Sequence, residues 1–75
     1  MKYSKDGIYN NVIMKSAAGY YLGSVTFEEG FYEPYSRESY YYLTEVDVLK
    51  DYPTAITLQT AFDMAKSDGF LKEFK

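Results

Sequence analysis

Side chains that could carry out acid–base or covalent chemistry near neutral pH are scarce in this chain of 75 residues. It contains no histidine and no cysteine, which removes the commonest general base, the thiol nucleophile and the usual ligands of transition metals. Catalysis would have to use carboxylates, lysine, tyrosine or serine. The composition therefore predicts a protein that is not an enzyme and that has no catalytic residues, no metal site and no cofactor.

Two pairs of carboxylates have a spacing that could supply an acid and a base. Glu28 and Glu29 are adjacent, and one residue separates Glu45 from Asp47. Such pairs are common on solvated turns, and a domain of this size has little room for a pocket that would shift their pKa values. We therefore interpret both pairs as solvated turn residues.

Neither a phosphate-binding loop nor a calcium loop is indicated. Gly19 and Gly23 are separated by Tyr-Tyr-Leu, without a GxGxxG or Walker pattern, and the segment is typical of a strand in which glycine relieves crowding. Glu45, Asp47 and Asp51 are spaced loosely like oxygen ligands, but the glycine and the terminal glutamate of an EF-hand loop are missing.

Length and composition predict one compact domain that spans residues 1–75. A chain of this length buries roughly 63% of its extended surface on folding, which is enough for one modest core. A hydrophobic content of 47% with charges of both signs argues against disorder. The absence of cysteine, of an apolar signal-like stretch near residue 1 and of a long apolar run favours a cytoplasmic protein that does not enter a membrane.

Two strands are expected in the first third of the chain. Residues 8–14, IYNNVIM, are rich in β-branched and aromatic side chains and are bounded by glycine and turn residues. Residues 20–27, YYLGSVTF, follow, and the alternation of a strand places Tyr21, Val25 and Phe27 on one face. That face is predicted to line the core.

The segment after these strands gives conflicting indications. Residues 28–30, Glu-Glu-Gly, are predicted to turn. Because Pro34 cannot donate a ladder hydrogen bond, residues 31–35 are predicted to form either an edge strand or a loop. Residues 39–43, SYYYL, are predicted to form a strand. In such a strand Tyr41 would lie on one face of the sheet and its neighbours Tyr40 and Tyr42 on the other.

A short helix is predicted next. Thr44 followed three residues later by Asp47 resembles an N-cap, and one or two helical turns would end before Pro53. Val46 and Val48 would also suit a strand that continues.

The last element gives the clearest pattern. Apolar residues recur at the three- and four-residue spacing of an amphipathic helix, namely Ala55, Leu58, Ala61, Phe62 and Ala65. Thr54 is predicted to cap its start and Gly69 to end it, and the tail with Phe70, Leu71 and Phe74 is predicted to cover the core or to form a dimer contact. The fold class expected is α+β: a small antiparallel sheet of three or four strands with one C-terminal amphipathic helix packed on one face.

Aromatic and acidic residues are concentrated in the same part of the chain. The twelve residues FYEPYSRESYYY, 31–42, hold five tyrosines. Residues 26–51 carry seven acids against Arg37 and Lys50, a balance of −5, whereas residues 1–25 carry a balance of +2. Such a region repels a phosphate backbone and favours a basic protein surface as its partner.

The sequence therefore predicts a small protein-binding module that acts as an inhibitor or adaptor through an acidic, tyrosine-rich surface between Glu28 and Tyr42. Tyrosine supplies rigid contact area, and arginine is a frequent interface anchor. The predicted partner-binding residues are Tyr32, Tyr35, Arg37, Glu38 and Tyr41.

Two other functions fit the same residues. The first is a binder of single-stranded nucleic acid or a small ligand on a tyrosine platform, near Lys2, Lys5 and Lys15. The second is a homodimer. In size, acidity and lack of catalytic residue types the chain is similar to small inhibitors encoded by phages and other mobile elements, including those that block nucleic-acid-dependent host defences; its acids would then imitate phosphates and occupy a nucleic-acid-binding site. This similarity of kind transfers no residue.

Overall fold

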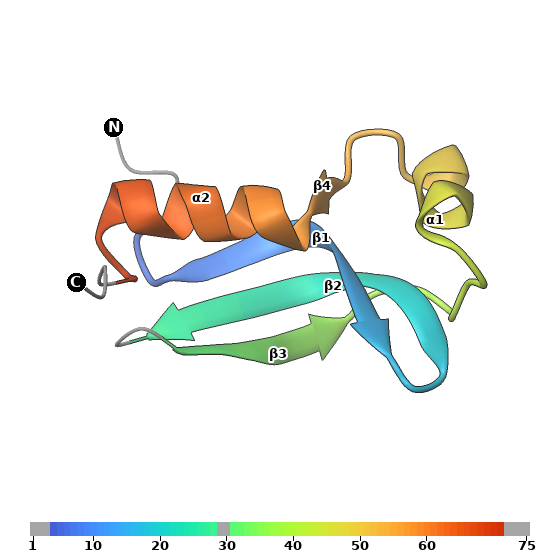
Figure 1. Cartoon of the computed structure of the whole chain (residues 1–75), viewed down its shortest axis with the longest axis horizontal. Coiled ribbons are helices and arrows are strands. Elements are labelled where there is room, and N and C mark those ends of the chain that lie inside the picture. Colours follow the sequence, from blue (N-terminus) through green and yellow to red (C-terminus); the bar gives the residue numbers. More distant parts are fainter. Residues whose placement is uncertain (1–3, 29–30, 72–75) are drawn as a thin grey trace.

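A sheet of four strands and two helices make up the fold (Figure 1). The computed structural model describes residues 4–28 and 31–71. The elements in chain order are β1 (Ile8–Ser16), β2 (Gly19–Glu28), β3 (Phe31–Arg37), α1 (Glu45–Asp51), β4 (Ile56–Thr57) and α2 (Leu58–Asp68). The strand order is β3-β2-β1-β4. Figure 1 shows α2 running along the sheet, with α1 at the upper right of the view.

The predicted fold class is confirmed, and the fourth strand adds one detail. β1, β2 and β3 are antiparallel, whereas the two residues of β4 pair in parallel with Val12 and Ile13 of β1, so the sheet is mixed. The turn predicted at residues 28–30 falls mainly on residues 29–30, which lie outside the described residues.

The main core lies between α2 and one face of the sheet. Val25 and Phe27 of β2 are almost fully buried there, together with Tyr21, which confirms the predicted core face. Ala61 and Ala65 of α2 are fully buried against this face. The prediction that the tail covers the core is confirmed by the packing of residues 70 and 71, while Phe74 lies outside the described residues.

A smaller core lies on the opposite face of the sheet, under α1. Val48 of α1 is fully buried against Ile13 and Leu22, with Tyr42 and Tyr52 packed around them. The middle of β2 is therefore covered on both faces, because α1 and α2 pack on opposite sides of it.

Both neighbours of β2 are bulged at the level of Ser24. On one side β1 inserts an extra residue at Asn10 and Asn11, and Asn11 adopts a φ of 62°, a conformation that asparagine tolerates better than most residues. On the other side Pro34 pairs with Val25 and Ser36 with Ser24, so the residue between them, Tyr35, has no partner in β2. Bulges bend a strand and increase its twist.

The helix ends follow capping rules, with one correction. The Thr44 hydroxyl accepts the amide of Asp47, as predicted for α1. The predicted start of the last helix at Thr54 is wrong, because residues 56–57 pair with β1 and the cap is Thr57, which accepts the amide of Thr60. Gly69 ends α2 in the left-handed conformation, with a φ of 90°, as predicted.

The end of α2 is tied to β1 through a buried carboxylate. Asp68 accepts hydrogen bonds from the Tyr9 hydroxyl and from the backbone amide of Ser4, and both Tyr9 and Asp68 are buried. Burial and the hydrogen bond to Asp68 raise the pKa of the Tyr9 phenol well above its ordinary value. The contact therefore requires the neutral phenol.

Candidate functional site

Exposed large hydrophobic side chains are confined to one stretch of the described chain. They are Phe31, Tyr32, Tyr35, Tyr40, Tyr41, Leu43 and Val46, which together we call the 31–46 surface. Their exposed fractions range from 44% for Tyr32 to 91% for Leu43. A concentration of exposed apolar side chains of this kind marks an interaction surface more often than a scatter of single residues does.

Three of the seven residues of this surface, Phe31, Tyr32 and Tyr35, lie on an edge strand. All seven residues of β3 are exposed, because the strand pairs with β2 on one side only and no helix covers it completely. Of the two structures predicted for residues 31–35, the edge strand is the one that forms. Pro34 is compatible with this position because an edge strand offers one side without ladder hydrogen bonds.

The strand predicted for residues 39–43 is wrong. After β3, Glu38 still donates its amide to the Leu22 carbonyl at 2.8 Å, and backbone-to-backbone pairing with β2 resumes only at Tyr42, which exchanges two hydrogen bonds with Tyr20. Four residues of chain therefore advance along two residues of β2. The intervening residues, 39–41, leave the regular backbone ladder at the edge of the sheet.

Ser39 makes this departure possible. Its buried hydroxyl accepts the amide of Leu22 at 2.8 Å, which satisfies a strand amide that a regular ladder would pair with a backbone carbonyl. The Ser39 carbonyl accepts a 2.9 Å hydrogen bond from Nη1 of Arg37. Tyr40 is left 85% exposed, and Tyr41 folds back toward the sheet.

Three of the five predicted partner-binding residues lie on the side of the sheet that faces α2. Tyr32 and Arg37 pair with core-facing positions of β2, and the Tyr32 ring lies edge-on to Phe62 of α2 at 5.0 Å. The Arg37 guanidinium lies 5.0 Å from the Tyr41 ring centroid, and Tyr41 packs edge-on against Tyr21 at 5.6 Å.

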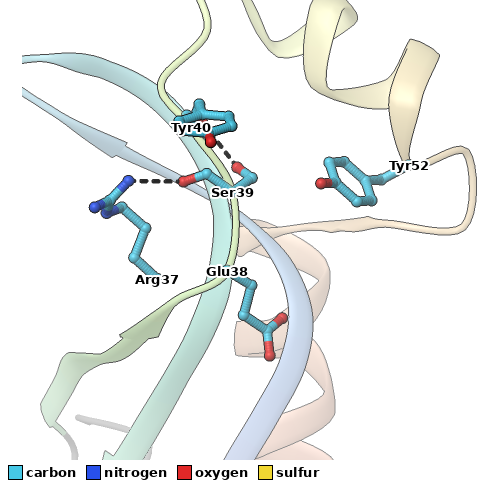
Figure 2. Close-up of a pocket in the computed structure, with 5 residues that line it drawn as sticks. All are labelled: Arg37, Glu38, Ser39, Tyr40 and Tyr52. Carbon is cyan, nitrogen blue, oxygen red and sulfur yellow. Dashed lines mark hydrogen bonds between the residues drawn. The ribbon is translucent and has the colours of Figure 1, made fainter.

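The other two predicted residues lie apart from this group. Glu38 is opposite Leu22 on the other face, and Figure 2 shows the side chains of Arg37 and Glu38 pointing away from one another. Tyr35 is the unpaired bulge residue and is 63% exposed. The structure therefore assembles Tyr32, Arg37 and Tyr41 along one side and separates Glu38 from them.

An open pocket of about 320 Å³ lies beside residues 39–41, the excursion of the chain from the edge of the sheet. It is lined by Arg37, Glu38, Ser39, Tyr40 and Tyr52. Tyr52 comes from the end of α1, twelve residues further along the chain than Tyr40, and no sequence pattern connects the two.

The five predicted site residues also did not include Phe31, Tyr40, Leu43 and Val46. Leu43 directly precedes the Thr44 cap, a position from which an apolar side chain usually packs against the fourth residue of the helix. That residue is Val48, which instead packs against the sheet, so Leu43 remains exposed. A helical pattern with Val48 inward would have placed Val46 outward.

The charge of this region is negative. Residues 31–51 carry five acids against Arg37 and Lys50, and the Arg37 guanidinium is already engaged by Ser39 and Tyr41. Among residues 4–28 and 31–71, no group of three His, Cys, Asp or Glu side chains is arranged to hold a metal ion. No helix in this part of the chain is long and apolar enough to cross a membrane.

Tyr42 should make the stability of the protein fall as the pH rises above 10. The Tyr42 hydroxyl donates a 2.6 Å hydrogen bond to Asp51, which, with burial, raises the pKa of Tyr42 to about 12 from its ordinary value of 10.0. This contribution is complete below pH 10 and is lost as the pH rises to about 12. At pH values below 10, we expect Tyr42→Phe to unfold at a lower urea concentration than wild type. This difference in the urea midpoint should vanish as the pH approaches 12.

Absorbance titration of tyrosinate supplies the control for this expectation. Asp51→Asn removes the negative charge but keeps an acceptor, so it should return the Tyr42 titration toward its ordinary range. A midpoint difference that persists unchanged at pH 12 would show that the contribution of the Tyr42 hydroxyl does not depend on its proton.

Comparisons of the chain with protein-family models, with curated protein sequences and with solved structures gave no match.

Proposed function

We propose that the protein is a non-enzymatic cytoplasmic binding module that docks on another protein through the 31–46 surface and acts there as an inhibitor or adaptor. The observation that carries this proposal is the confinement of every exposed large hydrophobic side chain of the described residues to sixteen consecutive positions. Covering such a surface in a complex removes apolar area from water, which is the main driving force of association.

The composition of the surface favours a protein partner. Tyrosine and phenylalanine are enriched at protein interfaces, because their rings bury a large area with few rotatable bonds. Five of the seven residues of the 31–46 surface are aromatic. A partner with apolar side chains at the centre of its own patch would complement them.

The charge of the surface favours a basic partner. Glu33, Glu38 and Glu45 are exposed along it, and they would steer a basic surface toward it and repel a phosphate backbone. This distribution supports a protein partner over single-stranded nucleic acid, whose platforms combine tyrosine with a cationic groove.

Arg37 is better explained as a positioning residue than as an interface anchor. Its guanidinium is held by the Ser39 carbonyl and the Tyr41 ring, so it fixes the start of the excursion that carries Tyr40 and Tyr41. The anchors are the rings themselves and Leu43.

Pairing of two copies through β3 is disfavoured by the strand itself. Pro34 removes one hydrogen-bond donor, Glu33 adds a charge, and the bulge at Tyr35 interrupts the regular edge. Natural edge strands use these three devices against edge-to-edge association.

Binding is tested by capture from the organism that encodes the chain, followed by titration of the purified partner. The double variant Tyr35→Ser/Leu43→Ser removes two exposed side chains and is expected to weaken binding at least tenfold, because truncated interface anchors cost about 2 kcal/mol or more each. The thermal midpoint should stay unchanged, since surface substitutions shift stability by about 0.5 kcal/mol or less.

The matched control is Gln59→Ser/Lys66→Ser, which changes two exposed residues of α2 that do not belong to the 31–46 surface. It should bind as the wild type does. Equal affinity of Tyr35→Ser/Leu43→Ser and wild type would refute the docking surface. Sedimentation that shows a dimer dissolved by the same double variant would assign the surface to self-association instead.

A further inference from the structure

We infer that the pocket beside Ser39 receives the cationic side chain of a lysine or arginine from the partner protein. The inference rests on the proposed function, because it assigns the partner a basic residue at a defined place. The residues that would contact the cation are Glu38, Tyr40 and Tyr52.

The arrangement of the pocket supports a cation. Figure 2 shows the ring of Tyr40 and the ring of Tyr52 on two sides of the buried Ser39, with the Glu38 side chain directed away from Arg37. The face of an aromatic ring attracts a cation, and a carboxylate forms charge-assisted hydrogen bonds with ammonium or guanidinium groups. Figure 2 shows the Glu38 carboxylate on the side of Ser39 away from both rings, so a long basic side chain would meet the rings and the carboxylate at different points along its length.

Arg37, the cationic residue among those that line the pocket, does not occupy the proposed position of the partner's cation. Although Arg37 contributes to the lining, its guanidinium donates to the Ser39 carbonyl at 2.9 Å and stacks over Tyr41, on the side opposite Glu38. Figure 2 shows no hydrogen bond between Arg37 and Glu38. Glu38 is exposed, so a cation of the partner can reach its carboxylate.

The size of the pocket fits one side chain better than a larger ligand. At about 320 Å³ it lies at the lower limit of small-molecule pockets. It opens next to Tyr40 of the 31–46 surface, so a partner lying on that surface could insert a long basic side chain from its rim. Aliphatic stems of lysine and arginine pack along rings while the charged end reaches a polar group.

Probes that carry only the side chain test the pocket directly. Nα-acetyl-arginine amide and Nα-acetyl-lysine amide are titrated into the 15N-labelled protein, and Nα-acetyl-citrulline amide serves as the neutral control. The cationic probes should shift the amide signals of residues 38–40 and 52 with saturation at millimolar concentration, and citrulline should not.

Variants identify the groups responsible. Glu38→Gln and Tyr52→Leu should each lower the affinity for the cationic probes by roughly twofold or more. Glu33→Gln removes the same charge from β3 outside the lining and should leave their affinity unchanged. Equal effects of Glu33→Gln and Glu38→Gln, equal binding of citrulline, or no localised shift would overturn the inference.

The outcomes also separate this inference from the proposed function. If Tyr35→Ser/Leu43→Ser abolishes partner binding while Glu38→Gln and Tyr52→Leu leave it unchanged, the docking surface stands and the cation pocket is refuted. If the probes bind and partner binding falls in Glu38→Gln but not in Tyr35→Ser/Leu43→Ser, the pocket stands and the 31–46 surface is refuted.

Discussion

Replacing Phe27 with alanine is expected to remove a large part of the protein's free energy of unfolding at 25 °C. Its side chain is 1% exposed, and its ring lies 5.5 Å from Tyr9 and 5.1 Å from Phe62. Removing a buried phenylalanine costs about 3–5 kcal/mol. A domain of this length has a total stability of roughly 4–11 kcal/mol, so the loss consumes much of it. Urea unfolding followed by circular dichroism measures the change.

Two further variants show whether burial explains the effect. Phe27→Leu keeps most of the buried volume and should lose markedly less stability than Phe27→Ala. Phe31→Ala removes the same ring from a position on β3 that is 76% exposed, and its unfolding midpoint should lie close to that of wild type. Similar losses for Phe27→Ala and Phe31→Ala would contradict the assignment of the core to the α2 face.

Substituting Gly23 with alanine is expected to detach β3 from β2. A Cβ atom at Gly23 would lie 2.3 Å from the Ser36 carbonyl oxygen and 3.0 Å from the Tyr21 ring, and the carbonyl belongs to the backbone of the paired strand. Overpacking of this kind costs about 1–3 kcal/mol. Because β3 carries much of the 31–46 surface, partner affinity should fall together with stability.

Amide hydrogen exchange distinguishes a local effect from general destabilisation. Gly23→Ala should reduce protection in β3 and at Leu22 before it affects the amides of α2. Gly69→Ala is the control, because nothing lies within 4 Å of its added methyl group and only the left-handed conformation is strained. That variant should loosen the end of α2 and leave β3 protected; uniform loss of protection in Gly23→Ala would refute the steric explanation.

Much of the fold could be predicted because local patterns agree with the packing. Alternation along residues 20–27 identified the core face. Thr44 caps α1 with its hydroxyl, and Gly69 ends α2 because glycine readily adopts the left-handed conformation. The interpretation of Gly23 as a residue that relieves crowding agrees with its closeness to Ser36. β4 escaped prediction because two residues are too few to show a period.

Residues 39–43 show why propensity alone was insufficient. Three consecutive tyrosines favour a strand, but the hydroxyl of Ser39 takes over a ladder hydrogen bond and lets the next residues leave the sheet. The start of α2 was misplaced for a related reason. Ala55 fits the helical spacing, yet it packs with the α1 cluster because β4 intervenes between it and the helix.

The stretch that carries the candidate site could be recognised in the sequence, but the division of its residues between the two faces of the sheet could not. Strict alternation puts Tyr35 and Arg37 on one face and Tyr32 on the other. The bulge adds one residue, so Tyr32 and Arg37 share the α2 side. Tyr52 was out of reach because only the tertiary fold brings the end of α1 beside Glu38.

The attachment of β3 has a consequence for how this scaffold can evolve. None of the buried core residues belongs to β3, and exposed substitutions seldom change stability by more than about 0.5 kcal/mol. A small protein near its stability threshold can therefore vary the side chains that would meet a partner without first acquiring compensating mutations. Under the proposed function, partner specificity would diversify on β3 while β1, β2 and α2 stay constrained by packing.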